Sequence, residues 1–325
     1  LYRLVVGGLA VSGMTSFAYE IYWTRSLVFI LGNSTYALTT MLASFLTGIA
    51  LGGFLARLLI RKSRDHAALF GVVQVLLGAS SAVALPLLFT LSDPQGLSLL
   101  LLDSSTRASA LVFTGFGIAF LVMLVPATLI GTTFPLAVQI NVRSLDRAGA
   151  SVGRLYAVNT FGNVLGALLP GLVLLGWLGI QRGILAMAAL NVALGVLILT
   201  LRLRHIAARP AWRFALPALL LAAVFAAGRA PVDFQFPSEN ELPGFETLYY
   251  REGPLATTKV YRDPATREKF MSVDGIVIGG TGNTEFKQLL LAHLPKLLLD
   301  DVSSELSVGI GSGILLGESA RHGGV

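Results

Sequence analysis

The sequence lacks cysteine and has few charged residues. None of its 325 residues is cysteine, which excludes disulfides, thiolate metal sites and a cysteine nucleophile. Charged residues make up 13% of the chain, where soluble domains carry about 25%. Hydrophobic residues make up 54%, and the mean hydropathy is +0.74. This composition excludes an ordinary soluble enzyme along the whole length and indicates several membrane-spanning helices.

Acidic residues are scarce in the first part of the chain. Residues 1–228 contain 5 Asp and Glu against 15 Lys and Arg, a net charge of +10, whereas residues 229–325 contain 13 against 9, a net charge of −4. The basic excess lies in short connections beside apolar runs, where the residues that orient a membrane protein are found. We therefore expect the lipid bilayer, and no nucleic acid, as the partner of residues 1–228.

Apolar runs of about 20 residues are long enough to cross a bilayer and define the expected helices. They cover residues 4–30, 36–60, 67–91, 109–140, 154–180 and 182–201. A seventh run, 214–228, has 15 residues and either spans the membrane or lies in its interface. The sequence thus predicts a polytopic α-helical bundle of six to seven spans in the inner (plasma) membrane.

Basic residues follow the second, fourth and sixth of these runs, and such loops face the cytoplasm. With six spans, the bundle begins and ends on the cytoplasmic side, whereas a seventh span over 214–228 places the following domain outside. Which side that domain faces therefore stays open. The loops contain the following basic residues: Arg57, Arg61, Lys62, Arg64, Arg143, Arg147, Arg154, Arg202, Arg204, Arg209 and Arg213.

Four polar residues inside the expected spans form a candidate membrane site. Glu20 either contacts a cation or amine, or forms a clamp with Arg25 at the interface, because a carboxylate in hydrocarbon needs a partner. Asn159 and Asn163 share one helix face and either line a polar path or hydrogen-bond across helices. Gln74 is interpreted in the same way as these two amides.

Glycine and proline mark close contacts and bends in the spans. Gly48 and Gly52, like Gly162 and Gly166, have the four-residue spacing that lets helix backbones approach. Three prolines are predicted to kink their helices, because each lacks a backbone donor. They are Pro126, Pro135 and Pro170.

The rest of the chain changes from helical to extended patterns. Residues 229–246 are rich in proline and acidic residues and form a linker. Residues 247–251, 256–262 and 268–273 are predicted strands, with a turn at 263–266. Asp274 and Gly275 form a strong hairpin signal before Ile276. We expect a small antiparallel sheet over residues 247–282.

Residues 283–325 have the pattern of the first unit of a Rossmann-like, methyltransferase-type α/β domain. An amphipathic helix over 285–299, bent or ended by Pro295, precedes a predicted buried strand over 305–310. The strand leads into Gly309, Gly311, Ser312 and Gly313 and then a helix. Such a loop lets the backbone approach a nucleoside, or serves only close packing of strand and helix. His293 is interpreted as a helix-end or core histidine.

Taken together, these features resemble the bacterial membrane-bound spermidine synthase-like proteins, in which a transporter-like bundle is fused to a polyamine aminopropyltransferase domain. The resemblance covers most of the chain and rests on short motifs whose order and spacing match. They are YEIYWTR at 19–25, GTTFP at 131–135, GRLYAVNTFG at 153–162, YREGP at 250–254, VDG at 273–275, LAHLP at 291–295 and the glycine loop at 309–313.

The resemblance implies transfer of an aminopropyl group from decarboxylated S-adenosylmethionine to a diamine such as putrescine. It implies that Gly309, Gly311, Ser312 and Gly313 hold this co-substrate, and that Asp274 and Glu285 contact the polyamine. It implies no permanently bound cofactor and no metal. The family's catalytic aspartate falls beyond Val325, so we expect the sequence to be an inactive fragment of a longer protein.

The chain departs from the soluble synthases in the residues around this loop. The family has glutamine where this sequence has Ala256 and Ile278, an Asp-Glu pair at 283–284 where it has Asn-Thr, and tyrosine where it has Lys287. Two alternatives to an enzyme therefore stay open. One is a transporter-like protein whose soluble part senses or docks, and the other is a membrane anchor with a degenerate, non-catalytic synthase domain. Whether the protein forms a homo-oligomer also stays open.

Overall fold

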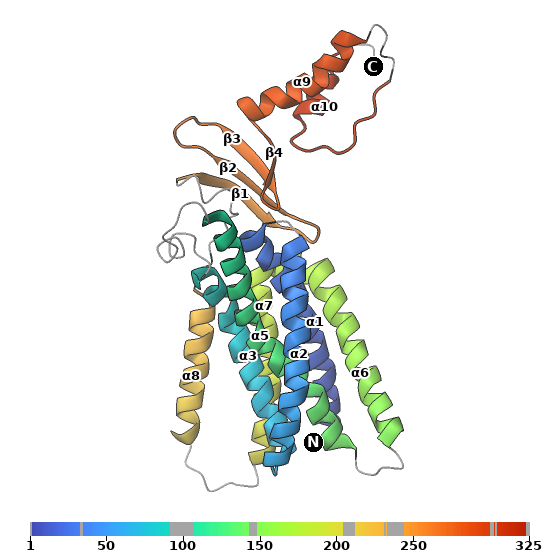
Figure 1. The fold of residues 1–325 in the computed structure, drawn as a ribbon, viewed down its shortest axis with the longest axis vertical. Helices are drawn as coiled ribbons and strands as arrows, with labels where there is room; N and C mark the ends of the chain where they lie inside the picture. Colours follow the sequence, from blue (N-terminus) through green and yellow to red (C-terminus); the bar gives the residue numbers. More distant parts are fainter. Residues whose placement is uncertain are drawn as a thin grey trace. The chain divides into compact units, whose positions relative to one another are not determined.

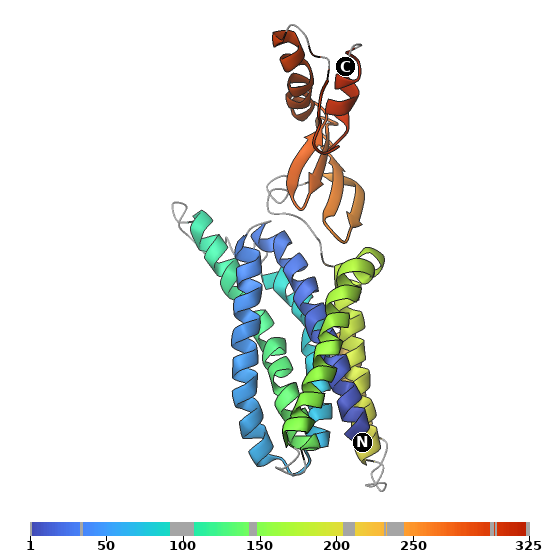
Figure 2. The ribbon, with the colours of Figure 1, turned by 90° about the vertical axis from the view of Figure 1, so that its right-hand side faces the viewer.

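The computed structural model describes residues 2–32, 35–91, 107–142, 148–203, 212–230, 232, 244–299, 302 and 304–322. The chain divides into two compact units, Leu1–Phe234 and Gln235–Val325. The first is a bundle of long helices, and the second holds a small sheet and two helices (Figures 1 and 2). Each unit is described by itself.

The first unit consists of helices that follow the apolar runs. Their bounds are α1 Tyr2–Leu31, α2 Thr35–Lys62, α3 His66–Leu91, α5 Arg107–Asn141, α6 Ala148–Leu169, the π-helix η1 Pro170–Leu174, α7 Leu175–Leu203 and α8 Trp212–Gly228. Five helical stretches are long and apolar enough to cross a membrane: Tyr2–Leu31, Thr35–Lys62, His66–Leu91, Thr114–Asn141 and Ala148–Arg202. The predicted apolar helical part is thereby confirmed.

The stretch from α6 to α7 reverses direction at Gly179. Gly162 lies against Ala10 and Gly166 against Met14, so α6 runs parallel to α1. Helix α7 runs antiparallel to α1, as Gly8 meets Leu194 and Tyr22 meets Gly183. Gly179 is the non-helical residue between them, with a φ of 71° that favours glycine. The reversal lies beside the boundary predicted between 180 and 182.

Small residues bring helix backbones into contact, as their spacing predicts. A Cβ on Gly52 would collide with the backbone of Thr128 and Gly131 in α5, and one on Gly162 with the backbone of Ala10 in α1. Helices α2 and α5, and helices α1 and α6, are therefore held at distances that only glycine permits.

Prolines act differently at different places in the bundle. Pro170 begins the π-helical turn η1, where the backbone N–H of Leu175 donates to the Pro170 carbonyl. A proline has no N–H for the regular helical ladder, and a π-turn is one way of accommodating that loss. Pro126 and Pro135 both lie inside α5, which continues through them.

One hydrophobic cluster of the first unit lies where α1, α3, α5, α6 and α7 meet. Buried side chains from all five helices form one hydrophobic cluster. It comprises Val5, Leu9, Phe70, Val73, Leu136, Ala137, Leu155, Leu194 and Ile198. Other large apolar side chains point outward, for example Leu46 and Phe161, which are 66% and 63% exposed. This arrangement is typical of helices that face lipid.

The second unit begins with a four-stranded antiparallel sheet in the order β1-β2-β3-β4. The strands are β1 Glu246–Glu252, β2 Thr257–Arg262, β3 Lys269–Val273 and β4 Ile276–Gly280. Tyr261 stacks on Phe270 across β2 and β3, with the Phe245 ring against both. The predicted small antiparallel sheet is confirmed.

The hairpin turn between β3 and β4 forms at the predicted dipeptide. Asp274 and Gly275 both have positive φ, 48° and 80°, as a two-residue turn of this type requires. The Thr257 backbone N–H donates to Asp274 Oδ1 at 2.8 Å, and the Asp274 N–H donates to the Thr257 carbonyl at 2.9 Å. Asp274 therefore ties the turn to the start of β2.

After the sheet, the chain forms two helices and an extended segment. Helix α9 spans Asn283–Leu298 and continues three residues past Pro295, so Pro295 does not end it. Helix α10 spans Ile314–Ser319. The strand predicted over 305–310 is wrong: these residues form no strand, and Leu306 and Val308 are 88% and 93% exposed. An apolar segment becomes a strand only when a neighbouring strand pairs with it, and the described residues supply none.

Candidate functional site

The glycine loop, residues 309–313, has a backbone that requires glycine. Gly309, Gly311 and Gly313 have φ values of 88°, 55° and 80°. A Cβ at any of the three would meet no atom within 4 Å, so conformation rather than crowding selects glycine here. One side of the loop is therefore open to an approaching molecule. The loop ends at α10, and the Gly317 N–H donates to the Gly313 carbonyl at 2.9 Å.

Ser312 fixes the loop to the sheet through Gln288 of α9. Its hydroxyl donates to Gln288 Oε1 at 2.6 Å, and Gln288 Nε2 donates to the Ile278 carbonyl in β4 at 2.9 Å. A Cβ on Gly279 would collide with the side chains of Ser312 and Gln288. Gly279 thus allows the close approach that places the loop beside the end of β4. The sequence motifs did not predict Gln288 as a part of this site.

A second tie joins the segment before the glycine loop to both helices. Lys296 Nζ lies 2.7 Å from Glu305 Oε2 and donates to the Ser319 carbonyl at 2.9 Å. The Ser319 hydroxyl donates to Glu305 Oε1 at 2.9 Å. The hydrogen bond from Lys296, followed by the one from Ser319, lowers the pKa of Glu305 below its ordinary value.

Two histidines and a glutamate connect α9 to the end of α10. His293 Nδ1 lies 2.7 Å from His322 Nε2, and His293 Nε2 lies 3.3 Å from Glu318 Oε2. The Arg321 guanidinium also pairs with Glu318. His293 is half-buried and lies five residues before the end of α9, so it is neither the helix-end nor the core histidine that its place before Pro295 predicts. Its pairing with His322 carries no signal in the sequence, because 29 residues separate them.

The two predicted polyamine contacts lie in different settings. Asp274 belongs to the β3–β4 turn, where Oδ1 accepts the Thr257 N–H. Glu285 is the third residue of α9 and is half-buried. A carboxylate in the first helical turn interacts favourably with the helix dipole. The two carboxylates therefore belong to different elements of the second unit, a hairpin turn and a helix.

The predicted membrane site also separates into parts. Glu20 is half-buried in α1. Its contact with a cation or amine and its clamp with Arg25 both stay predictions. Asn159 and Asn163 lie where α6 meets Gly13 of α1. The Asn163 amide, oriented as a donor, donates to the carbonyls of Asn159 and Gly13 at 3.1 and 3.2 Å. This matches the interpretation of a hydrogen bond across helices.

A buried polar network joins three helices of the bundle. The Tyr19 hydroxyl donates to Asn191 Oδ1 at 2.9 Å. Asn191 Nδ2 donates to Thr15 Oγ1 at 3.0 Å and to Gln74 Oε1 at 2.8 Å. All four side chains are fully buried. Gln74 hydrogen-bonds across helices as predicted, whereas Asn191 was not singled out by any motif.

Comparison with known proteins shows a similarity to a curated enzyme. A polyamine aminopropyltransferase from Corynebacterium efficiens is 26% identical to this chain over 223 residues, which cover 67% of this chain and 39% of that protein. The chain therefore spans well under two thirds of the length of the curated relative that it matches. No family model matches the chain, and no solved structure matches it.

The site in the second unit is thus a glycine loop supported from two directions. Gln288 holds Ser312 against β4, and Lys296 holds Glu305 and the end of α10 against α9. These contacts leave the backbone of the loop uncovered at its three glycines. The glycine loop therefore presents a fixed backbone surface without side chains, to which the flat or bulky part of a ligand can bind.

Proposed function

We propose that this protein is a membrane-bound aminopropyltransferase that acts on polyamines. Three observations support the proposal: the similarity to a polyamine aminopropyltransferase, the apolar helices of the first unit, and the glycine loop. The loop carries the argument, because its three left-handed glycines leave open space at the place where the adenosyl part of the co-substrate would bind. The co-substrate is decarboxylated S-adenosylmethionine, and the acceptor is a diamine such as putrescine.

The proposed reaction is a nucleophilic substitution at carbon. The lone pair of a neutral amine attacks the methylene carbon of the aminopropyl group, the one bonded to the sulfonium sulfur. The new N–C bond forms as the C–S bond breaks, and sulfur keeps the bonding electron pair. The products are 5′-methylthioadenosine and an ammonium ion that releases one proton to a base. Most of the acceleration in such a step comes from holding the two reactants in line.

The chain's own residues have two roles in this proposal. Gly309, Gly311 and Gly313 hold the adenosyl part, and Ser312, fixed by Gln288, sets the position of the loop relative to β4. Glu285 supplies a carboxylate that attracts the cationic end of the diamine. Asp274 has a structural role in the hairpin, because one of its carboxylate oxygens already accepts a backbone hydrogen bond.

The proposal is tested by co-substrate binding to the full natural protein, measured by titration calorimetry with decarboxylated S-adenosylmethionine. Gly309→Val should weaken binding at least tenfold, because valine is strained at a φ of 88°. Gly317→Val is the matched control, as Gly317 is helical and its Cβ would meet no atom within 4 Å. The absence of binding to the unaltered protein, or equal binding by the two variants, would contradict the proposal.

A further inference from the structure

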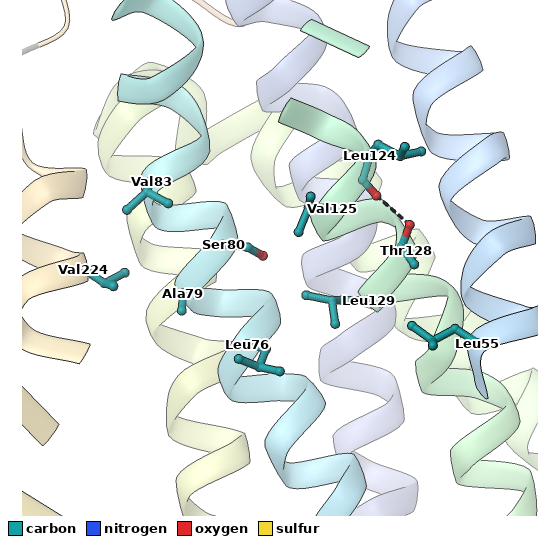
Figure 3. A pocket seen from close by; sticks show the side chains of 10 residues that line it. All are labelled: Leu55, Leu76, Ala79, Ser80, Val83, Leu124, Val125, Thr128, Leu129 and Val224. Atoms are coloured by element: carbon teal, nitrogen blue, oxygen red, sulfur yellow. Dashed lines mark hydrogen bonds between the residues drawn. The ribbon is translucent and has the colours of Figure 1, made fainter. Parts of the chain in front are cut away.

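An apolar groove crosses the outer surface of the helical bundle (Figure 3). Its volume is about 560 Å³. Helices α3 and α5 form its floor, with Leu76 and Val125 among the lining residues. Leu55 of α2 and Val224 of α8 form its two rims. Leu76 and Val125 are 50% and 56% exposed, so the groove opens outward instead of being enclosed.

The groove offers no free polar group to a ligand. Of its ten lining residues only Ser80 and Thr128 have hydroxyls. The Ser80 hydroxyl donates to the Leu77 carbonyl at 3.1 Å, and the Thr128 hydroxyl donates to the Leu124 carbonyl at 2.8 Å, as Figure 3 shows for Thr128. Because both are satisfied within their own helices, the groove selects an apolar occupant.

The depth of the groove places it in the hydrocarbon layer. Leu76 lies 10 residues after the start of α3, and Thr128 lies 13 residues before the end of α5. At the helical rise these positions are roughly 15–20 Å from the helix ends that carry the basic residues, near the middle of a ~30 Å hydrocarbon core. What fills an open apolar groove at this depth is a lipid chain.

A cation lies below the groove on the same face of α2. Lys62 follows Leu55 by seven residues, which is two helical turns, and it lies roughly 10 Å closer to the basic end. It is exposed in the last turn of the helix. Arg57, two residues after Leu55, lies on the opposite face of α2. The groove and Lys62 together therefore match a molecule with a long chain and an anionic headgroup.

We propose that this groove binds one phospholipid, with an acyl chain between α8 and α5 and an anionic headgroup at Lys62. The bound chain fills the space over α3 and α5 that α8 borders. Helix α8 connects the bundle to the second unit, and it packs against α3 in the described part of the bundle. The lipid then forms part of the surface against which α8 packs.

Native mass spectrometry of the purified protein, after mild delipidation and addition of phosphatidylglycerol or phosphatidylcholine, tests the proposal. Ala79→Trp fills the floor of the groove and should reduce lipid retained per protein at least fivefold. Ala167→Trp is the matched control on exposed α6 and should retain lipid as the unaltered protein does. Lys62→Gln should abolish the preference for phosphatidylglycerol, whereas Arg57→Gln should keep it.

Because Ala79→Trp risks misfolding, a second measurement uses the cysteine-free sequence. The fluorescence of a label on Ser80→Cys should be quenched by phospholipids that carry a quencher on an acyl chain. Excess unlabelled phosphatidylglycerol should reverse this quenching more strongly than excess phosphatidylcholine. Ala167→Cys should be quenched with no preference between the two lipids. Equal retention in Ala79→Trp and Ala167→Trp, or competition at Ser80→Cys without lipid preference, would overturn the proposal.

Discussion

At the residue scale, the polar side chains inside the bundle determine which helices are neighbours. Asn191 connects α7 to α1 and α3 through three hydrogen bonds, to Tyr19, Thr15 and Gln74. In hydrocarbon there is no water to replace these bonds, so each polar group needs a protein partner. The network therefore fixes one arrangement of helices among the many that apolar surfaces alone would allow.

Replacing Asn191 should destabilise the bundle. Asn191→Leu leaves the Tyr19 hydroxyl and the Gln74 amide without their buried partner, at an expected cost of about 1–3 kcal/mol in unfolding free energy. Asn141→Leu is the control, because Asn141 donates within its own helix to Ala137. Thermal unfolding in detergent measures both variants. Equal stability of the two would show that the network does not hold the helices together.

The pH dependence of the second unit should follow Glu305. Its pKa is lowered in the folded state by Lys296, so the tie between 304–310 and the helices is present above the carboxyl's ordinary pKa of about 4.3. The tie is lost as the pH falls through the lowered pKa that Glu305 has in the folded state. Amide hydrogen exchange in α10, corrected for intrinsic rates, should increase between pH 5 and pH 3. Glu305→Gln should exchange faster at pH 5 and lose most of this change; an unaltered profile would contradict the assignment.

At the element scale, glycine spacing predicted the closest helix contacts. Gly162 and Gly166 let α6 lie against the backbone of Ala10 and Met14 in α1. Gly162→Val should force the two helices apart, lowering the unfolding free energy by about 1–3 kcal/mol. Gly153→Val on the same helix is the control, because its Cβ would meet no atom within 4 Å. Thermal unfolding in detergent compares them, and equal midpoints would refute this packing.

Sequence patterns predicted the elements better than their connections. Apolar runs located the long helices, and Asp274-Gly275 located the hairpin, because both signals are local. The strand over 305–310 failed because a strand needs a partner that no local pattern guarantees. The network around Asn191 was missed because Tyr19 lies 172 residues away in the sequence. Gln288 was missed because its contact with Ser312 exists only after α9 and the glycine loop meet.

At the scale of the whole molecule, contacts between helix ends predict a direction for the chain through the membrane. Arg202 pairs with Asp65, so the end of α7 lies beside the α2–α3 connection and its basic residues. Helix α8 starts after this end, and Gln181 donates to the Gly228 and Ala230 carbonyls at the opposite end of α7. With 17 residues α8 is roughly 25 Å long, close to the hydrocarbon thickness. We therefore expect the chain to leave the bundle on the side away from the basic loops.

Single cysteines test this direction, because residues 1–325 contain none. Ala265→Cys, in the exposed turn between β2 and β3, should react with an impermeant maleimide added outside intact cells. Ser63→Cys, between α2 and α3, should react only after the membrane is opened, because basic loops stay in the cytoplasm. Labelling of both residues from the same side would show that α8 does not cross the membrane.

We propose above that a membrane-embedded helical bundle carries an aminopropyltransferase. Membranes that contain the full natural protein, supplied with decarboxylated S-adenosylmethionine and putrescine, test it most directly. Mass spectrometry should detect spermidine and 5′-methylthioadenosine in equal amounts, formed by the membrane fraction and reduced at least tenfold by Gly309→Val but not by Gly317→Val. Membranes that form neither product, with the protein folded and both substrates present, would contradict the claim.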